Sequence, residues 1–198
     1  MRYQPQHKVE VHRKIVRGAA RRVRAEGLTG AAVSAIMSDS GLTHGGFYKH
    51  FASKDRLLIE SLHEAFRQIA DTLARAARNR PPATAWKAIV DAYLSTEHCD
   101  HAECGCPLAA LAPELARASK PMKLRLQSEL ENYKTRLLPF MPGRTIADKE
   151  RAFLAIISTM LGAVAIARVL PDPASRARVL ANARGFLLRR FQSPSRVR

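Results

Sequence analysis

Apolar residues recur along the chain at steps of three and four, the spacing that places side chains on one face of an α-helix. The first such stretch covers 8–26, and Gly27 follows it as a glycine commonly follows a helix. Its stripe consists of Val9, His12, Val16, Ala20 and Val23. Long alternating runs of apolar and polar residues, which are typical of strands, do not occur in the sequence. The pattern therefore predicts an all-α fold.

The same periodicity predicts helices along the rest of the chain. They cover 33–40, 43–48, 53–78 and 83–95, then one helix from Pro107 and one from near Pro121, and finally 145–170 and 174–191. An irregular stretch is expected over 98–105, and Pro113 is expected to kink or split its helix because its ring removes a backbone donor.

Residues with capping side chains precede several of these helices. Thr43 and Ser53 each carry a hydroxyl that can accept a hydrogen bond from an unpaired N–H in the first turn. Thr145 with Asp148 resembles a capping sequence, and Asp172 precedes a proline that suits a first helical position. These signals fix the expected starts of four helices.

The charge and hydropathy of the chain limit the kinds of partner that it can have. The chain has 33 basic and 17 acidic residues, a formal net charge of +16, which favours a polyanionic partner such as nucleic acid or an anionic membrane surface. The 16 uncharged residues between Arg151 and Arg168 fall short of the roughly 20 that span a bilayer, so a buried core helix is expected there and no membrane partner. The start of the chain lacks the apolar stretch of a secretory signal, which predicts a cytoplasmic protein.

The most informative segment is 33–55, where two short predicted helices flank Gly41. That arrangement is typical of a helix-turn-helix, which inserts its second helix into the major groove of DNA. Gly45 and Gly46 lie in this second helix although each costs about 1 kcal/mol relative to alanine. A close approach of the backbone to DNA would offset that cost.

The segment resembles the signature of the TetR family of transcriptional regulators, in which a small polar residue opens the recognition helix and a Phe-Tyr-x-His-Phe block closes it. Here the block is 47–51, and the resemblance covers about 15–58. Met37 is a departure, because many relatives have alanine there, and we expect packing to absorb it. The resemblance implies a DNA-binding domain of three helices over 1–52, a helical ligand-sensing and dimerisation domain over 53–192, and a basic tail over 193–198.

The resemblance also implies roles for single residues in DNA binding. Thr43, His44 and Gly45 would meet base edges or nearby phosphates. Tyr48, His50 and Lys54 would grip backbone phosphates, with Lys49 as a further contact. Phe47 and Phe51 would point inward and dock the recognition helix. The alternatives are that the segment is only a tight helical corner, and that His50 is structural.

In the second domain, the resemblance implies a cavity for a small apolar or amphipathic inducer and a four-helix dimer interface. Candidate cavity residues are Phe66, Trp86, Tyr93, Leu111, Met122 and Leu126. The last two helices are apolar on more than one face, so one face can pack on a second subunit. Candidate interface residues are Ile157, Leu161, Val164, Leu180 and Leu187. A purely internal core is the alternative.

The expected function is a repressor that binds double-stranded, palindromic operator DNA as a homodimer and is released by the inducer, with activation as an alternative. Three cysteines lie within 99–106 beside His98 and His101, so a metal site and a redox sensor are alternatives, and ordinary thiols are favoured because the spacing is cramped. An enzyme using Cys106 lacks an acid partner and an oxyanion-hole motif. The sequence predicts no catalytic residue, no metal and no cofactor. An architectural DNA-binding protein is the remaining alternative.

Overall fold

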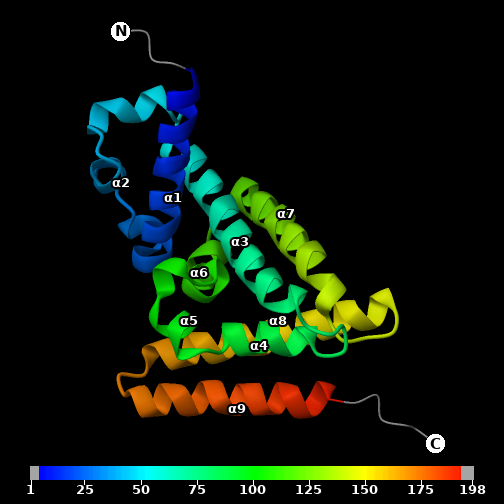
Figure 1. Ribbon diagram of the computed structural model, residues 1–198. Helices are drawn as coiled ribbons and strands as arrows, with labels where there is room; N and C mark the ends of the chain where they lie inside the picture. Colours follow the sequence, from blue (N-terminus) through cyan, green and yellow to red (C-terminus); the bar gives the residue numbers. More distant parts are fainter. Residues whose placement is uncertain (1–4, 193–198) are drawn as a thin grey trace, which may run out of the picture. The chain divides into compact units, whose positions relative to one another are not determined.

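The computed structural model describes residues 5–192, and every regular element in that range is a helix (Figure 1). The elements are α1 (Pro5–Gly30), α2 (Val33–Asp39), η1 (His44–Lys49), α3 (Lys54–Arg78), α4 (Ala85–Tyr93), α5 (Thr96–Asp100), η2 (Ala102–Cys104), α6 (Pro107–Ala116), α7 (Lys120–Leu137), η3 (Leu138–Phe140), α8 (Ile146–Val169) and α9 (Pro173–Phe191). The predicted all-α class is confirmed. The tail predicted over 193–198 lies outside the described residues.

Capping side chains set several helix starts. The Ser53 hydroxyl accepts a hydrogen bond of 3.1 Å from the backbone N–H of Arg56 at the start of α3. α8 begins with a capping box, in which Thr145 Oγ1 accepts from the Asp148 N–H and the Asp148 carboxylate accepts from the Thr145 N–H, both at 3.1 Å. The carboxylate of Asp172 accepts from two N–H groups in the first turn of α9. These three predicted starts are confirmed.

The segment predicted as a third α-helix differs from expectation. It is the 3-10 helix η1, and Thr43 makes no side-chain capping hydrogen bond, so that prediction is wrong. The Gly46 N–H donates to the Thr43 carbonyl at 3.0 Å and the His50 N–H to the Phe47 carbonyl at 2.9 Å, each across three residues. Two consecutive glycines weaken an α-helix, and a short 3-10 turn is the tighter alternative.

Three further details depart from the pattern. Gly27 does interrupt α1, with a φ of 81° that suits glycine, but helical residues resume as far as Gly30. Pro113 lies inside α6 and does not split it, since the helix continues from Pro107 to Ala116. The stretch expected to be irregular contains the end of α5, which Ser95 caps by accepting from the His98 N–H at 3.1 Å.

The described residues form two compact units. The first comprises 5–68 with 102–130, and the second comprises 69–101 with 131–192. Helices α3 and α7 each contribute to both. The boundary predicted between the DNA-binding and ligand-sensing domains, at residues 52 and 53, does not coincide with these compact units and stays a prediction.

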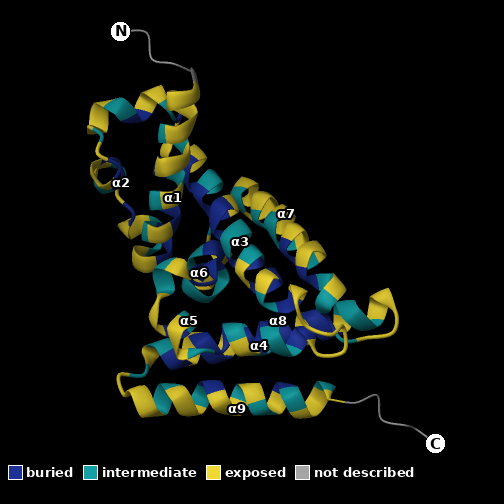
Figure 2. Ribbon diagram, viewed as in Figure 1, coloured by how far each residue is buried: buried dark blue, intermediate teal, exposed yellow. Residues whose placement is uncertain are grey.

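The core of the first unit joins the N-terminal helices to α6. Ile15 and Ala19 of α1 pack in one cluster with Phe47 of η1, and Leu111 and Leu115 of α6 belong to the same cluster. All five side chains are buried (Figure 2). Met37 is fully buried in this cluster too, which confirms that packing absorbs the departure from alanine. The predicted recognition segment therefore rests on a core that includes residues from 102–130.

The second unit is built around the packing of α8 against α9. Met160 and Val164 of α8 and Leu187 of α9 have no exposed side-chain surface. Aromatic contacts extend this core: the Trp86 and Phe191 rings meet edge to face with 6.0 Å between centroids. The predicted apolar character of both helices thus serves first to pack the chain against itself.

Candidate nucleic-acid interface

Two aromatic rings anchor the predicted recognition segment. Phe47 and Phe51 are each 2% exposed, and their rings stack with 5.6 Å between centroids. The prediction that they point inward is confirmed. Because these rings occupy the core, the residues between and before them are held at the surface.

Six of the seven predicted DNA contacts are exposed. They are Thr43, His44, Gly45, Tyr48, Lys49 and Lys54, whereas His50 is half-buried. Tyr48 is 73% exposed, although an aromatic ring gains from burial, so its position offers a phenolic hydroxyl to a partner. The seven assignments stay predictions, and the geometry leaves six of these residues open to a partner.

The two glycines of η1 are not required by the fold. A Cβ at Gly45 would meet no atom within 4 Å, and a Cβ at Gly46 would lie 3.6 Å from Met37 Cε, an ordinary contact. Neither residue has a positive φ. Alanine would fit at both positions in the free protein, so the reason for glycine has to lie outside the described part of the chain.

Histidines border the recognition segment. The His12 ring stacks on Phe51 at 4.5 Å, and its Nε2 lies 2.7 Å from the carboxylate of Glu60. His50 Nδ1 is buried and has no hydrogen-bond partner among residues 5–192. Burial, followed by the charges of His12, Lys8 and Lys49, holds the pKa of His50 below its ordinary value. A neutral His50 is therefore favoured, and both the phosphate role and the structural role remain open to it.

Comparison with known proteins agrees with this geometry. The sequence model of the bacterial regulatory proteins of the tetR family matches residues 15–60, which contain α2, η1 and most of α1. The fold resembles that of a TetR transcriptional regulator from Chloroflexus aurantiacus J-10-FL, with 24% identity, a TM-score of 0.76, and coverage of 95% of this chain and 97% of that chain. Residues 15–60 therefore carry the DNA-binding helix-turn-helix of the tetR family. Over its length the chain has the fold of TetR-type transcriptional regulators.

Two other TetR-type structures give the same fold at lower identity. E. coli NemR in its reduced form is 16% identical, with a TM-score of 0.72 over 90% of this chain and 95% of that chain. A TetR-family regulator from Agrobacterium tumefaciens is 18% identical, with a TM-score of 0.71 over 92% and 98%. A search of curated proteins gave no match. All three solved structures thus share the fold of this chain.

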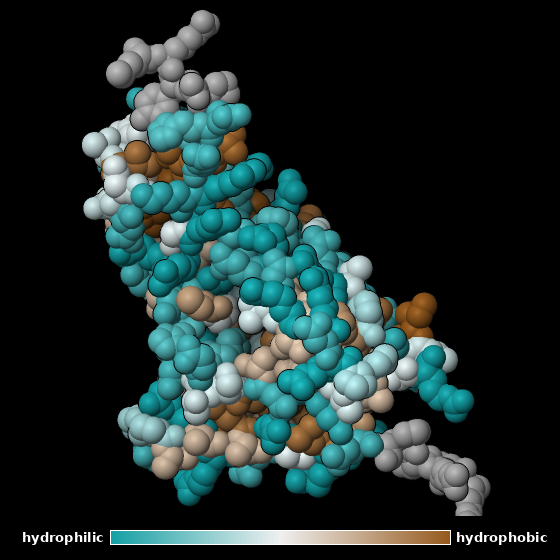
Figure 3. Space-filling model, in the orientation of Figure 1, coloured by the Kyte–Doolittle hydropathy of each residue, from teal (hydrophilic) through white to brown (hydrophobic). Residues whose placement is uncertain are grey.

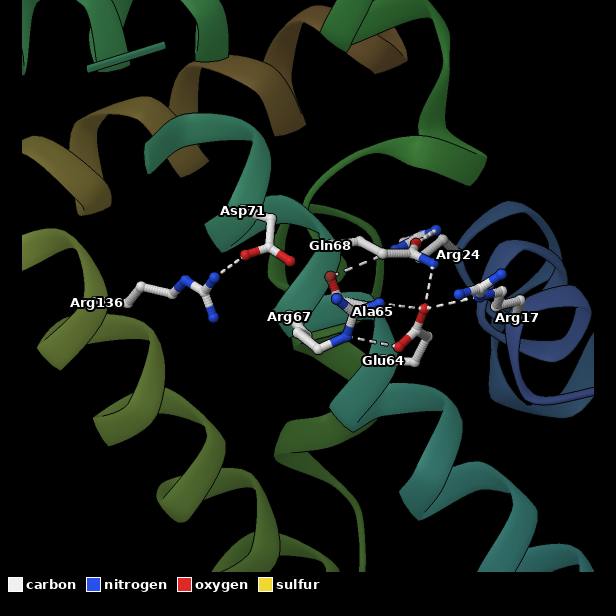
Figure 4. A network of polar contacts seen from close by, with 8 residues as sticks. All are labelled: Arg17, Arg24, Glu64, Ala65, Arg67, Gln68, Asp71 and Arg136. Carbon is white, nitrogen blue, oxygen red and sulfur yellow. Dashed lines mark hydrogen bonds and ion pairs between the residues drawn. The ribbon is translucent and has the colours of Figure 1, made fainter. Parts of the chain in front are cut away.

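A polar network that the sequence patterns did not reveal connects α1 to α3 within the first unit (Figure 4). Arg24 is only 3% exposed, and its Nε donates to the Glu103 carbonyl at 2.7 Å while Nη2 donates to Gln68 Oε1 at 2.8 Å. Glu64, one turn before Gln68, accepts from Gln68 Nε2 at 2.8 Å. The available signal was that Arg24 lies four residues after Ala20, in the buried stripe of α1.

The predicted cavity residues fall in both units. Phe66, Leu111, Met122 and Leu126 lie in the first, and Trp86 and Tyr93 in the second. Leu111 is part of the core that supports the recognition segment, and Met122 and Leu126 pack against it. A cavity of about 330 Å³ in the second unit is lined by Ala76, Arg80, Thr84, Lys87, Ala88 and Asp91. None of the six predicted residues lines it, so their ligand role stays a prediction.

Most of the predicted dimer residues are buried inside the chain. Ile157, Val164, Leu180 and Leu187 have little or no exposed surface, and Leu161 is half-buried. The exposed large apolar residues of the same helices are Ile146, Leu154, Ile166, Val169 and Phe186. Hydrophobic atoms reach the surface over the part of the second unit where α8 and α9 lie (Figure 3). Periodicity did not reveal which face of these helices is left exposed, and the dimer interface stays a prediction.

Helix α8 meets, by length and composition alone, the criterion for a membrane-crossing helix, and 44% of its most apolar window is buried in the fold. The core helix of a soluble protein meets the same criterion. Among residues 5–192, α8 is the single helix that meets this criterion.

The cysteine segment divides between the units. Cys99 is buried in the second, while in the first Cys104 is exposed and Cys106 is the buried N-cap of α6. All three are free thiols, and burial, as the largest cause, raises the pKa of Cys99. Within 5–192 no three His, Cys, Asp or Glu side chains are grouped so that they could hold a metal ion.

His98 precedes this segment and is held neutral. Burial is the main cause that lowers the pKa of His98 to about 4, the charge of Arg168 adds to it, and a hydrogen bond with the Tyr93 carbonyl opposes it. Because a carbonyl oxygen only accepts, His98 Nδ1 carries the proton of that 2.6 Å hydrogen bond.

Proposed function

We propose that the protein is a ligand-responsive repressor in the cytoplasm, which binds a palindromic operator as a homodimer and is released by a small apolar or amphipathic molecule. The observation that carries the DNA-binding part is the pair of glycines at 45 and 46, exposed and half-buried respectively, which no packing or backbone requirement in residues 5–192 explains. A glycine backbone lets the recognition segment lie closer to base edges than any side chain would. Phe47 and Phe51 hold the segment in place.

The dimer is supported by the uncovered face of α8 and α9. Leu154 and Ile166 are separated by three turns of α8, and the exposed Ser158 and Gly162 lie between them at intervals of four residues. Phe186 of α9 is also exposed. Small residues between large apolar ones allow a second helix to approach closely, and burial of such a patch favours association. In this proposal the buried residues that the sequence predicted as interface residues, such as Val164, pack beneath the interface and do not contact the second subunit.

Release follows from the spacing of the two recognition segments. Two half-sites one DNA turn apart lie about 34–36 Å from each other, and a ligand that binds better to a differently spaced dimer lowers operator affinity. Moving such an equilibrium from 1:99 to 99:1 takes about a 10⁴-fold difference in ligand affinity between the two shapes. The resemblance to TetR-type regulators supplies the expectation of an inducer.

The test is selection of double-stranded DNA fragments from a random pool by the purified full-length protein. An inverted repeat should emerge, and His44→Ala should change the selected bases. A reporter gene behind the selected site should be repressed when the protein is expressed. Recovery of sequence-independent DNA would contradict the regulator, a single non-symmetric site would contradict the symmetric dimer, and activation of the reporter would contradict the repressor.

A further inference from the structure

A recess in the first unit lies between α1 and α3 and has a volume of about 300 Å³. Arg13, Val16 and Arg17 line it from one face of α1, since they are three and four residues apart. Glu64 and Arg67 line it from one turn of α3. None of these residues belongs to the predicted DNA contacts or to the predicted inducer cavity.

The carboxylate in the recess is already satisfied by its own helix. Arg67 Nε and Nη2 each donate to Glu64 at 2.8 Å, and Gln68 Nε2 donates to it at 2.8 Å (Figure 4). Burial disfavours the ionised form of Glu64, but these hydrogen bonds and the charges of Arg67 and Arg17 outweigh burial and hold the pKa of Glu64 below its ordinary value. Glu64 is therefore ionised at neutral pH and can take few further donors.

The two arginines of α1 keep their donors available. Arg17 Nε lies 3.6 Å from Glu64 Oε1, beyond a hydrogen bond, and its side chain is 65% exposed. Arg13 is exposed and makes no hydrogen bond or ion pair with any residue in 5–192. Three guanidinium groups and one carboxylate leave the recess with a charge of +2. The spacing of Arg13 and Arg17 sets like charges on neighbouring turns, which repel unless an anion lies between them.

We propose that this recess binds a small phosphate-bearing metabolite, with Arg13 and Arg17 donating to its phosphate group. Planar guanidinium groups match phosphate oxygens in pairs, and a dianionic phosphate balances a charge of +2. A concave volume of this size suits a small molecule, and Val16 offers an apolar side to the remainder of the ligand. Because the ligand would contact α1 and α3 together, it would stabilise the pairing of these two helices of the DNA-binding unit. The proposal stands independently of the inducer in the proposed function.

The experiment titrates full-length protein with inorganic pyrophosphate at constant ionic strength and measures heat and thermal unfolding. We expect saturable binding with a Kd below about 1 mM and a rise in Tm. The double variant R13Q/R17Q should weaken binding at least about tenfold. The control R78Q/R144Q removes the same charge from exposed arginines of the second unit and should bind as the unaltered protein does.

A gain of binding separates a ligand site from a structural role. E64Q removes the carboxylate, so pyrophosphate should bind several-fold more tightly even if the variant is less stable. Absence of saturable binding, equal binding by R13Q/R17Q, or equal loss in R78Q/R144Q would overturn the proposal. A lower salt dependence of operator binding in R13Q/R17Q, without pyrophosphate binding to the unaltered protein, would assign these arginines to DNA phosphates instead.

Discussion

Gly45→Ala should stabilise the protein and weaken its binding to DNA. The residue lies in η1, is exposed, and has an ordinary negative φ. A Cβ built there would meet no atom within 4 Å, so alanine can be added without displacing anything in the free protein. Damage to the fold lowers stability and function together, and opposite changes in the two therefore point to a glycine kept for its partner.

The expected magnitudes follow from this local structure. Replacing glycine by alanine at a compatible backbone position raises the free energy of unfolding by about 0.4–1 kcal/mol, because the unfolded chain has fewer conformations to lose. On DNA, the added methyl group would hold the recognition segment off the base edges. We expect at least a tenfold loss of operator affinity, which corresponds to about 1.4 kcal/mol.

Gly18→Ala is the matched control. Gly18 lies in α1, where a Cβ would make an ordinary contact at 3.8 Å from Ser40 Oγ. It should stabilise the protein by a similar amount and leave operator affinity unchanged. Unfolding is followed in urea at a fixed protein concentration, because dimerisation makes stability depend on concentration. Affinity is measured by fluorescence anisotropy with a labelled operator. Unchanged operator affinity in Gly45→Ala would refute the close approach of this glycine to DNA, and a loss of stability would refute the assignment of free space around it.

Three further predictions address other parts of the chain. Lys54→Ala should weaken operator and nonspecific DNA alike and lower the slope of log affinity against log salt by about 1.8, because each protomer of the dimer loses one phosphate contact; an unchanged slope would remove Lys54 as a phosphate contact. Ile166→Glu should dissociate the dimer in sedimentation, whereas Leu124→Glu, at a residue equally exposed at 56% on α7, should not; an unchanged dimer in the first variant would contradict the proposed interface. Because burial holds the pKa of His98 at about 4, between pH 6.5 and 4 only the unfolded chain takes up its proton, and stability should fall by about 2 kcal/mol from pH 7 to pH 5. Denaturant titrations at both pH values should show this loss and its absence in His98→Gln, and equal losses in the two proteins would contradict the assignment.

The features predicted best from the sequence are those that depend on residues close together in the chain. A hydroxyl or carboxylate before a helix acts on N–H groups only two or three residues away, so the starts at Ser53, Thr145 and Asp172 could be predicted. The recognition segment could also be predicted from the sequence, because its aromatic and glycine residues occur together within a few positions. Its 3-10 geometry could not be predicted, since hydroxyl-capped α-helices and short 3-10 turns begin with similar residues.

Long-range packing could not be predicted in the same way. Helix α8 is apolar on several faces, so periodicity could not decide that Val164 packs against the chain's own helices while Ile166 stays exposed. Nothing near Leu111 in the sequence indicates that it joins the core of the recognition segment. The buried Arg24 was hidden for a related reason: its acceptors, at Gln68 and the Glu103 carbonyl, are distant in sequence.

The participation of α6 in the N-terminal core bears on how this protein can be recombined. A DNA-reading cassette cut after residue 52 or 68 would lose Leu111 and Leu115, and fully burying each leucine is worth about 1.5–3 kcal/mol. That is a large share of the stability of a small domain. Exchange of operator specificity between relatives is therefore easier through substitutions on the surface of η1 than through transplantation of the whole head, and a chimaera needs the matching face of α6 from the same parent.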